Sequence, residues 1–285
     1  MKVGIIGSRG QLGSDLIKIL GDSIPLDRPD FDVFLPSSWD AVTARGIDVL
    51  INTSAYNEVD QAETDMDSCF NLNTISPARL ANFCDTNKII FITISTDYVF
   101  GFPPADPPVP FSEKSETNPL SVYGVSKRAG EILTSNRCNQ SYVIRTCGLY
   151  GYASIARART SFVETMLRLA QKGNPISVVS DQIVSPTPTY DLALAIKKLI
   201  EQQPPFGVYH LTADGSCSWY DFAKKIFDLV GLSVILKSTT MAEFNAKARR
   251  SPYTVLSNEK ARRYGIRLPP WDVGLADYLT NRKME

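Results

Sequence analysis

The stretch Val3-Gly4-Ile5-Ile6-Gly7-Ser8-Arg9-Gly10-Gln11-Leu12-Gly13 decides the fold of this 285-residue chain. A short apolar run ends in a glycine-rich turn, and the turn opens directly into a helical pattern over 11–20. Glycine permits a tight turn and lets the backbone approach a pyrophosphate, while a helix N-terminus supplies free N–H groups and positive potential. A glycine triplet in this strand–turn–helix context predicts a dinucleotide site that includes Gly7 and Arg9.

Further apolar runs alternate with helical patterns along the next 130 residues or so. They do not alternate with polar residues, which is typical of strands covered on both faces of a parallel sheet. The predicted strands are 2–6, 24–26, 49–51, 89–94 and 142–144, and the predicted helices are 11–20, 67–87 and 120–135. Pro77 is expected to kink or interrupt the second of these helices. The order predicts an α/β fold, a Rossmann-like doubly wound parallel sheet.

The pattern changes after Gly151. Helical segments are predicted at 160–172, 190–202, 219–230 and 272–281, joined by extended pieces at 176–179 and 208–211. We expect residues 1–150 to form the dinucleotide-binding domain, with later strands returning to it around 175–212. Residues 151–285 are expected to form mainly a smaller, interleaved C-terminal substrate-binding lobe that ends in a frayed tail.

Five prolines fall within 102–111, directly after a predicted strand. Such a segment suits neither helix nor sheet. Two interpretations remain open: a stiff surface connection, or a wall over a site at the carboxyl end of the strand, where open α/β sheets bind ligands.

Composition excludes several classes. Thirty basic and thirty acidic residues give zero formal net charge, which argues against a general nucleic-acid binder. No apolar stretch approaches the roughly 20 residues that a membrane-spanning helix needs. Five scattered cysteines without a Cys-x-x-Cys indicate reduced thiols, and the N-terminus does not resemble a signal peptide, so a cytoplasmic protein is expected. The single histidine, His210, excludes His-clustered metal sites and is expected to be a packed, hydrogen-bonded ring.

The second predicted strand ends in Leu26-Asp27-Arg28. An acidic side chain there can accept hydrogen bonds from the adenosine ribose hydroxyls, which favours NAD, whereas arginines favour the 2′-phosphate of NADP. Because Asp27, Arg28 and Arg9 all belong to this region, the choice between NADH and NADPH stays open, and we expect dual use.

Tyr123-Gly124-Val125-Ser126-Lys127 places a phenol and an ammonium on one helix face. A neighbouring cation favours the phenolate, so Lys127 is expected to lower the pKa of Tyr123 from about 10 toward working pH. Such a tyrosine can exchange a proton with a carbonyl or alcohol oxygen while hydride moves at the same carbon. Thr96, at a predicted strand end, would orient the substrate oxygen or hydrogen-bond the phenol; simple turn chemistry is the alternative.

A second pair with the same spacing, Tyr220 and Lys224, serves as an internal control. No glycine turn or strand-end hydroxyl accompanies it. We expect a core tyrosine and a solvated lysine there.

Together these motifs resemble the dTDP-4-dehydrorhamnose reductase family of extended short-chain dehydrogenases/reductases. The resemblance covers essentially the whole chain, through GSRGQLG at 7–13, NTSAYNEVDQAE at 52–63, STDYVFG at 95–101, YGVSK at 123–127, DQIVSPT at 181–187, YHLTADGSCSWYDFA at 209–223 and LPPWDVGL at 268–275. It implies NADH- or NADPH-dependent reduction of a dTDP- or UDP-linked 4-keto-6-deoxy sugar, as in deoxysugar and polysaccharide biosynthesis.

The resemblance also implies residue roles. Tyr123 would donate the proton, Lys127 would tune it and hold the nicotinamide ribose, and Thr96 would poise the tyrosine. Asp97 and Tyr98 would help seat the sugar, and Arg250 is a candidate for the diphosphate. The cofactor would be lined by Gly10, Gln11, Leu12, Asp27, Thr53, Ser54, Ala55 and Ile94.

Departures from the family bear on the substrate. Gly148 stands at the sugar-side position where relatives usually carry tryptophan, and Arg250 survives from the family's Arg-Pro-x-Asn-Ser-x-Leu, most of which is altered here. Tyr98 stands where related dehydratases carry glutamate, which disfavours dehydration. Some relatives bind magnesium through acidic side chains at a dimer contact; Asp15 replaces the usual glutamate, so a homodimer is considered and a metal is not expected.

Two alternatives remain open. One is a non-catalytic regulatory subunit, because the β subunit of methionine adenosyltransferase resembles this same branch; the intact set of Thr96, Tyr123 and Lys127 argues against it. The other is a UDP-sugar epimerase/reductase. The nucleotide and the stereochemistry of the sugar are not determined by the sequence.

Overall fold

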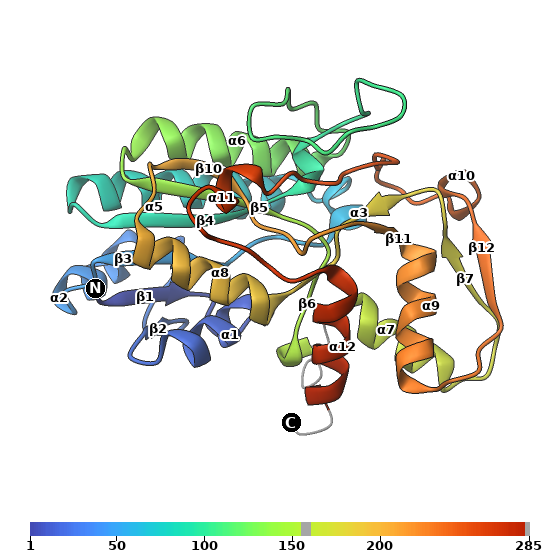
Figure 1. The fold of residues 1–285 in the computed structure, drawn as a ribbon. Coiled ribbons are helices and arrows are strands. Elements are labelled where there is room, and N and C mark those ends of the chain that lie inside the picture. Colours follow the sequence, from blue (N-terminus) through green and yellow to red (C-terminus); the bar gives the residue numbers. More distant parts are fainter. Residues whose placement is uncertain (155–160, 283–285) are drawn as a thin grey trace.

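The computed structural model describes residues 1–154 and 161–282 and centres on a parallel sheet of six strands (Figure 1). The strand order is β10-β5-β4-β3-β1-β2. The strands are β1 (Val3–Ile6), β2 (Ile24–Leu26), β3 (Val49–Asn52), β4 (Ile90–Thr96), β5 (Ser141–Thr146) and β10 (Gly207–His210). The chain winds outward in both directions from the β1–β3 neighbours, so their carboxyl ends form the switch point where such sheets bind ligands. The predicted doubly wound sheet is confirmed.

Helices cover both faces of this sheet, which explains why its strands are apolar runs. On one face α1 (Gln11–Leu20) packs with α8 (Thr189–Gln202), and both contribute to a core shared with β1, β3 and β5. On the other face lie α2 (Asp40–Ala44), α5 (Ser76–Thr86) and α6 (Val122–Arg137). Every residue of β1 and β3 is buried.

The later part of the chain builds three small two-stranded sheets beside the main one. β6 (Leu149–Tyr150) pairs with β9 (Thr187–Pro188), β7 (Ile176–Val179) with β12 (Leu236–Thr239), and β8 (Ile183–Val184) with β11 (Cys217–Ser218). They are accompanied by α7 (Phe162–Ala170), α9 (Trp219–Val230), α10 (Met241–Phe244) and α12 (Trp271–Asn281), whereas α11 (Glu259–Arg262) contacts β10 of the main sheet. α7, α9 and α12 share a separate apolar core around Phe222.

Of the late strands, β10 is an edge strand of the main sheet, whereas β7 pairs with β12 instead. The expectation that strands from about 175 onward return to the main sheet is therefore wrong for β7. Its residues are only alternately buried, which suits a sheet covered on one face rather than on two. The predicted helix start at Thr160 and the tail residues 283–285 lie outside the described residues.

The segment predicted as one helix over 67–87 is divided in three. α4 (Met66–Phe70) leads into a π-helical segment, Asn71–Ile75, and α5 follows with Pro77 in its first turn. Proline lacks the N–H that an α-helical ladder needs, so the predicted interruption lies on its N-terminal side. The sequence patterns did not predict α3 (Val59–Ala62), a four-residue helix that precedes α4.

The proline-rich segment is largely exposed from Phe102 to Pro110, which fits a surface connection. Only its end is anchored, because the buried Phe111 ring stacks on Phe100 with 4.3 Å between centroids. No helix in the described part of the chain is both long enough and apolar enough to span a membrane.

Candidate active site

The glycine turn between β1 and α1 is shaped for close approach of a ligand. Gly7 has φ of +75°, and a Cβ there would lie 2.8 Å from the Thr53 hydroxyl oxygen. A Cβ on Gly13 would collide with the Gly7 carbonyl oxygen. α1 begins without a side-chain cap and without an acidic residue in its first turn, which leaves its N-terminus available to an anion. Nearby, the buried side-chain oxygen of Gln11 accepts no hydrogen bond from the part of the chain that the structure describes. The cradle fits a dinucleotide phosphate.

Asp27 lies beside this turn, at the end of β2. Its carboxylate accepts a hydrogen bond from the Ser8 hydroxyl, and Arg9 Nε lies 3.7 Å from the same oxygen. Arg28 turns to Asp32 instead, with 2.8 Å between Nε and Oδ2. The turn thus carries an exposed arginine, Arg9, and the acidic Asp27 lies beside it. The feature that favours NADPH and the feature that favours NADH are therefore both present.

Three further residues that the resemblance assigns to the cofactor follow β3, at the same switch point. Thr53 donates to the Ile6 carbonyl oxygen at 2.7 Å, and the Ser54 hydroxyl donates to Asn52 Oδ1 at 2.6 Å. The first bond holds the start of the segment 53–58 against β1, and the second ties it to the end of β3. Ala55 continues it.

The structure brings Thr96, Tyr123 and Lys127 together. Tyr123 lies in the first turn of α6, with Lys127 one turn later, and both side chains are buried. The Thr96 hydroxyl, which donates to Asp97 Oδ1 at 3.1 Å, interacts with the Tyr123 hydroxyl. Lys127 Nζ donates to the Ile94 carbonyl oxygen at 2.6 Å, two residues before Thr96 on β4. The Thr96 hydroxyl oxygen also accepts from the Tyr98 backbone N–H.

The prediction that Lys127 lowers the pKa of Tyr123 is wrong. Burial raises the pKa of Tyr123 well above its ordinary value, and the interaction with Thr96 opposes this only in part. Burial also lowers the pKa of Lys127 to about 8, against the influence of Glu131. Desolvation therefore outweighs charge attraction, and the phenol keeps its proton. A protonated phenol at this place is suited to act as an acid.

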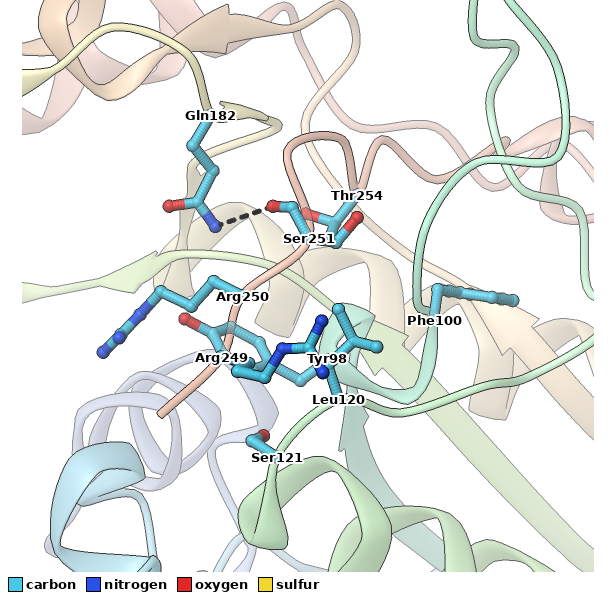
Figure 2. A pocket seen from close by; sticks show the side chains of 9 residues that line it. All are labelled: Tyr98, Phe100, Leu120, Ser121, Gln182, Arg249, Arg250, Ser251 and Thr254. Atoms are coloured by element: carbon cyan, nitrogen blue, oxygen red, sulfur yellow. Dashed lines mark hydrogen bonds between the residues drawn. The ribbon is translucent and has the colours of Figure 1, made fainter. Parts of the chain in front are cut away.

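A small cavity lies beside Tyr98 (Figure 2). Tyr98, Ser121, Gln182 and Arg250 are among the side chains that line it. The Tyr98 ring meets the Tyr123 ring edge-on, with 5.5 Å between centroids. Burial raises the pKa of Tyr98 to about 12. The Gln182 amide donates to the Ser251 carbonyl oxygen at 3.2 Å across the top of the cavity.

Asp97 and Arg250, both assigned to the substrate by resemblance, are already engaged with the protein. Asp97 is buried, and its carboxylate accepts from the Thr254 hydroxyl and from the Cys147 thiol, at 2.5 and 3.1 Å. Arg250 forms two bonds to the Asp60 carboxylate, at 2.8 and 3.2 Å. Asp97 therefore supports the strand end, while Arg250 bridges the cavity and α3.

Gly148 lies under an indole ring from another element. Its φ is +54°, and a Cβ there would lie 3.2 Å from both Trp219 Cη2 and Pro186 Cα. Trp219 begins α9, and its Nε1 donates to Gln182 Oε1 at 3.2 Å. Trp219 thus lies over Gly148, the position at which relatives carry a tryptophan of their own.

Gly148→Ala is expected to lower the free energy of unfolding by about 1–3 kcal/mol, because the added methyl meets two neighbours and the left-handed backbone disfavours any Cβ. Urea unfolding of the variant and the parent measures the change. Gly173→Ala is the matched control, since φ there is +70° and no atom lies within 4 Å of the added carbon. Equal losses in the two variants would show that crowding by Trp219 and Pro186 contributes nothing.

A buried ionic network behind the site was not predicted from the sequence. The Glu131 carboxylate, 2% exposed, accepts two bonds from Arg145 at 2.8 and 2.7 Å. It also accepts from the Ser95 hydroxyl at 2.5 Å, next to Thr96. Two signals were available: Glu131 follows Lys127 by one helical turn, and Arg145 is a lone charge in a buried strand, which requires a partner.

His210 ends β10 inside this network. Its Nε2 lies 3.4 Å from Arg145 Nη1, and its ring meets Phe100 edge-on. Burial and the nearby arginine lower the pKa of His210 to about 3, so the ring is neutral. The ring is packed as expected. The control pair also fits its expectation, since Tyr220 is half-buried beside the late core and Lys224 is exposed.

Three acidic residues approach one another where α1, α8 and α12 meet. Asp15 and Asp277 raise the pKa of Asp191 to about 6, after the larger effect of burial. Within residues 1–154 and 161–282, no three His, Cys, Asp or Glu side chains are arranged to hold a metal ion.

Asp191→Asn is expected to stabilise the protein by about 1–2 kcal/mol at pH 8 and to have little effect near pH 4. A carboxyl with a raised folded-state pKa costs stability once pH exceeds that pKa, and none below the unfolded-state value. Urea unfolding at pH 4, 6 and 8 measures the trend. A difference that does not grow with pH would contradict this account of Asp191.

Comparison with known proteins agrees with this geometry. A family model described as the RmlD substrate binding domain matches residues 1–284. The dTDP-4-dehydrorhamnose reductase of Escherichia coli is 31% identical over 294 residues, which cover 96% of each chain. The chain belongs to the dTDP-4-dehydrorhamnose reductase family.

Two reductase structures and one further relative extend the comparison. A crystal structure of the Clostridium acetobutylicum reductase has a TM-score of 0.91 and 34% identity and covers 100% of both chains. The Bacillus anthracis reductase, solved in complex with NADP, has a TM-score of 0.90 and 34% identity over 98% of this chain and 99% of that one. The spore coat polysaccharide biosynthesis protein SpsK of Bacillus subtilis is 38% identical over 82% of this chain and 80% of its own length.

Proposed function

We propose that this protein is an NADPH- or NADH-dependent reductase of a nucleotide-linked 4-keto-6-deoxy sugar, of the dTDP-4-dehydrorhamnose to dTDP-rhamnose type. The observation that carries the proposal is the meeting of Thr96, Tyr123 and Lys127 at the strand ends next to the glycine turn. The names of the relatives support the same reaction, and SpsK supports a place in polysaccharide biosynthesis.

Residues of this chain would bind the dinucleotide, orient the reacting groups and protonate the product oxygen. Gly7, Arg9, Gly10, Gln11 and Leu12 would hold the dinucleotide phosphates, Asp27 and Arg28 its adenosine end, and Thr53, Ser54, Ala55 and Ile94 the remainder. Bound nicotinamide supplies the hydride to C4 of the sugar. Tyr123 gives its hydroxyl proton to the former carbonyl oxygen, and Thr96 orients the phenol. The raised pKa of Tyr123 suits this step, because an alkoxide is much more basic than a phenolate.

Charge on Lys127 would stabilise the phenolate left after proton transfer. Thr96, Asp97, Tyr98, Gly148 and Arg250 would face or support the sugar nucleotide, with residues 151–285 supplying most of the substrate lobe. The five cysteines are all unpaired and buried, which supports a reducing, cytoplasmic setting. A homodimer is the assembly we propose to test by light scattering.

The test is a cofactor-oxidation assay. The protein is mixed with NADPH or NADH and with dTDP- or UDP-linked 4-keto-6-deoxy sugars, and loss of the reduced-nicotinamide absorbance is followed. Turnover with a dTDP sugar is expected, and product analysis separates simple reduction from epimerisation. A folded sample that turns over none of these substrates, yet alters the activity of a co-purified enzyme, would favour a regulatory subunit instead.

A further inference from the structure

The short helix α3 lies between the segment predicted to line the cofactor and two parts of the catalytic site. It begins directly after residues 53–58. Asp60 lies in α3 and Glu63 follows its last residue, and the two carboxylates contact different elements. Asp60 contacts the segment around Arg250, and Glu63 contacts the start of α6.

Glu63 holds the end of α6 that carries the phenol. Its Oε1 accepts a hydrogen bond at 2.9 Å from the backbone N–H of Val122, the first residue of that helix, and Tyr123 comes next. The first N–H groups of a helix have no intrahelical partner, and a carboxylate is favoured there. The Ser121 hydroxyl accepts only the N–H of Gly124. Glu63 is therefore the contact from α3 that fixes this helix end.

Asp60 holds Arg250 and, through it, Tyr98. Its carboxylate accepts from the Ala248 backbone N–H at 2.9 Å as well as from the Arg250 guanidinium. These bonds hold the pKa of Asp60 below its ordinary value, so the ion pair is formed at neutral pH. Arg250 and Tyr98 line the same cavity, and the Tyr98 ring contacts the Tyr123 ring.

Apolar packing joins the two contacts. Ala62 of α3 is fully buried in a small cluster with Cys69 and Tyr123, and Val59 and Tyr98 both pack against this cluster. The same apolar cluster thus joins α3 to both tyrosines, while the carboxylates of Asp60 and Glu63 hold the arginine and the helix start next to them.

We propose that α3 is a positioning element of the active site, in which Glu63 fixes Tyr123 through the start of α6 and Asp60 fixes Arg250 against Tyr98. The inference rests on the proposed reductase function for its kinetic readouts. Neither residue takes part in proton or hydride transfer. Because Glu63 positions the proton donor, its loss is expected to slow the chemical step. Because Asp60 positions Arg250, its loss is expected to weaken binding of the sugar nucleotide.

Glu63→Ala is expected to lower kcat about tenfold or more, with the KM of the sugar nucleotide nearly unchanged. Glu63→Gln is expected to restore the rate, because an amide oxygen still accepts from the Val122 N–H. Thr240→Ala is the matched control: it removes the hydroxyl cap of the exposed helix α10 and is expected to leave kcat unchanged. A normal kcat in Glu63→Ala, or a glutamine variant as impaired as the alanine variant, would overturn the role of Glu63.

Asp60→Asn is expected to raise the KM of the sugar nucleotide and the Kd of dTDP about fivefold, with kcat retained, because Arg250 and Tyr98 lose their fixed orientation. Unchanged constants would overturn the role of Asp60. Tighter binding would overturn it too, since it would show that the carboxylate competes with the ligand for Arg250.

Hydrogen exchange separates this inference from the proposed function. In the parent protein the amides of the first turn of α6 are expected to be protected, and Glu63→Ala is expected to speed their exchange while Glu63→Gln does not. A folded parent that reduces no sugar nucleotide refutes the reductase proposal alone. Exchange that is the same in parent and Glu63→Ala refutes the positioning role, whatever the turnover.

Discussion

Replacing Tyr123 with phenylalanine is expected to lower kcat for sugar-nucleotide reduction by a factor of about 10²–10⁴ while sparing cofactor affinity. The substitution deletes one oxygen, the hydroxyl that interacts with Thr96, and keeps the ring that packs on Ala62 and Cys69. The proton donor is lost, while the glycine turn that would hold the dinucleotide is untouched. Steady-state kinetics gives kcat, and quenching of protein fluorescence by NADPH gives the affinity.

The chain contains its own control for this experiment. Tyr220 and Lys224 repeat the spacing of Tyr123 and Lys127, but they lie on α9, where Tyr220 packs at the margin of the late core. Tyr220→Phe is expected to leave kcat unchanged. A Tyr123→Phe variant that retains a near-normal rate, or a loss of equal size in both variants, would refute the assignment of Tyr123 as proton donor.

Replacing Arg145 with methionine is expected to lower the free energy of unfolding by about 3–5 kcal/mol. The arginine and Glu131 are each 2% exposed, and the substitution leaves the carboxylate buried with Ser95 and Arg128 as its remaining partners. A buried charge that loses its main partner keeps its desolvation cost without the attraction that offset it. Urea unfolding followed by circular dichroism measures the loss.

The double variant Glu131→Leu/Arg145→Met tests the cause. Removing both charges is expected to recover much of the stability, because apolar side chains of similar size can occupy the space without an unpaired charge. Glu131→Leu alone is expected to be destabilised like Arg145→Met. A double variant whose loss equals the sum of the two single losses would show that packing, rather than the unpaired charge, determines the effect.

Local patterns predicted the features that depend on short stretches of chain. The glycine turn lies between β1 and α1 as expected, because strand, turn and helix succeed one another within 20 residues. The bounds of α1 agree with the prediction at both ends. β7 was correctly expected to be extended, but its partner was not predictable, since pairing with β12 joins residues about 60 positions apart.

For the catalytic residues, too, local features were predicted correctly and features that depend on distant parts of the chain were not. The spacing of Tyr123 and Lys127 placed them on one helix face, whereas the direction of the pKa shift of Tyr123 was wrong. The spacing is visible in the sequence, but the degree of burial is not. Burial comes from distant elements, among them Ala62 and Cys69, and the charge of Lys127 is directed to the Ile94 carbonyl oxygen.

By itself, the sequence determined the glycine turn and the tyrosine–lysine pair, because each follows from backbone geometry over a few consecutive residues. It also determined the doubly wound sheet, through the alternation of apolar runs and helical patterns. Only the tertiary structure decided that Trp219 covers Gly148, that Asp60 holds Arg250, and that Glu131 pairs with Arg145 behind Thr96. These contacts join residues far apart in the chain. Their energies depend on the exclusion of water from the assembled interior, which no local pattern specifies.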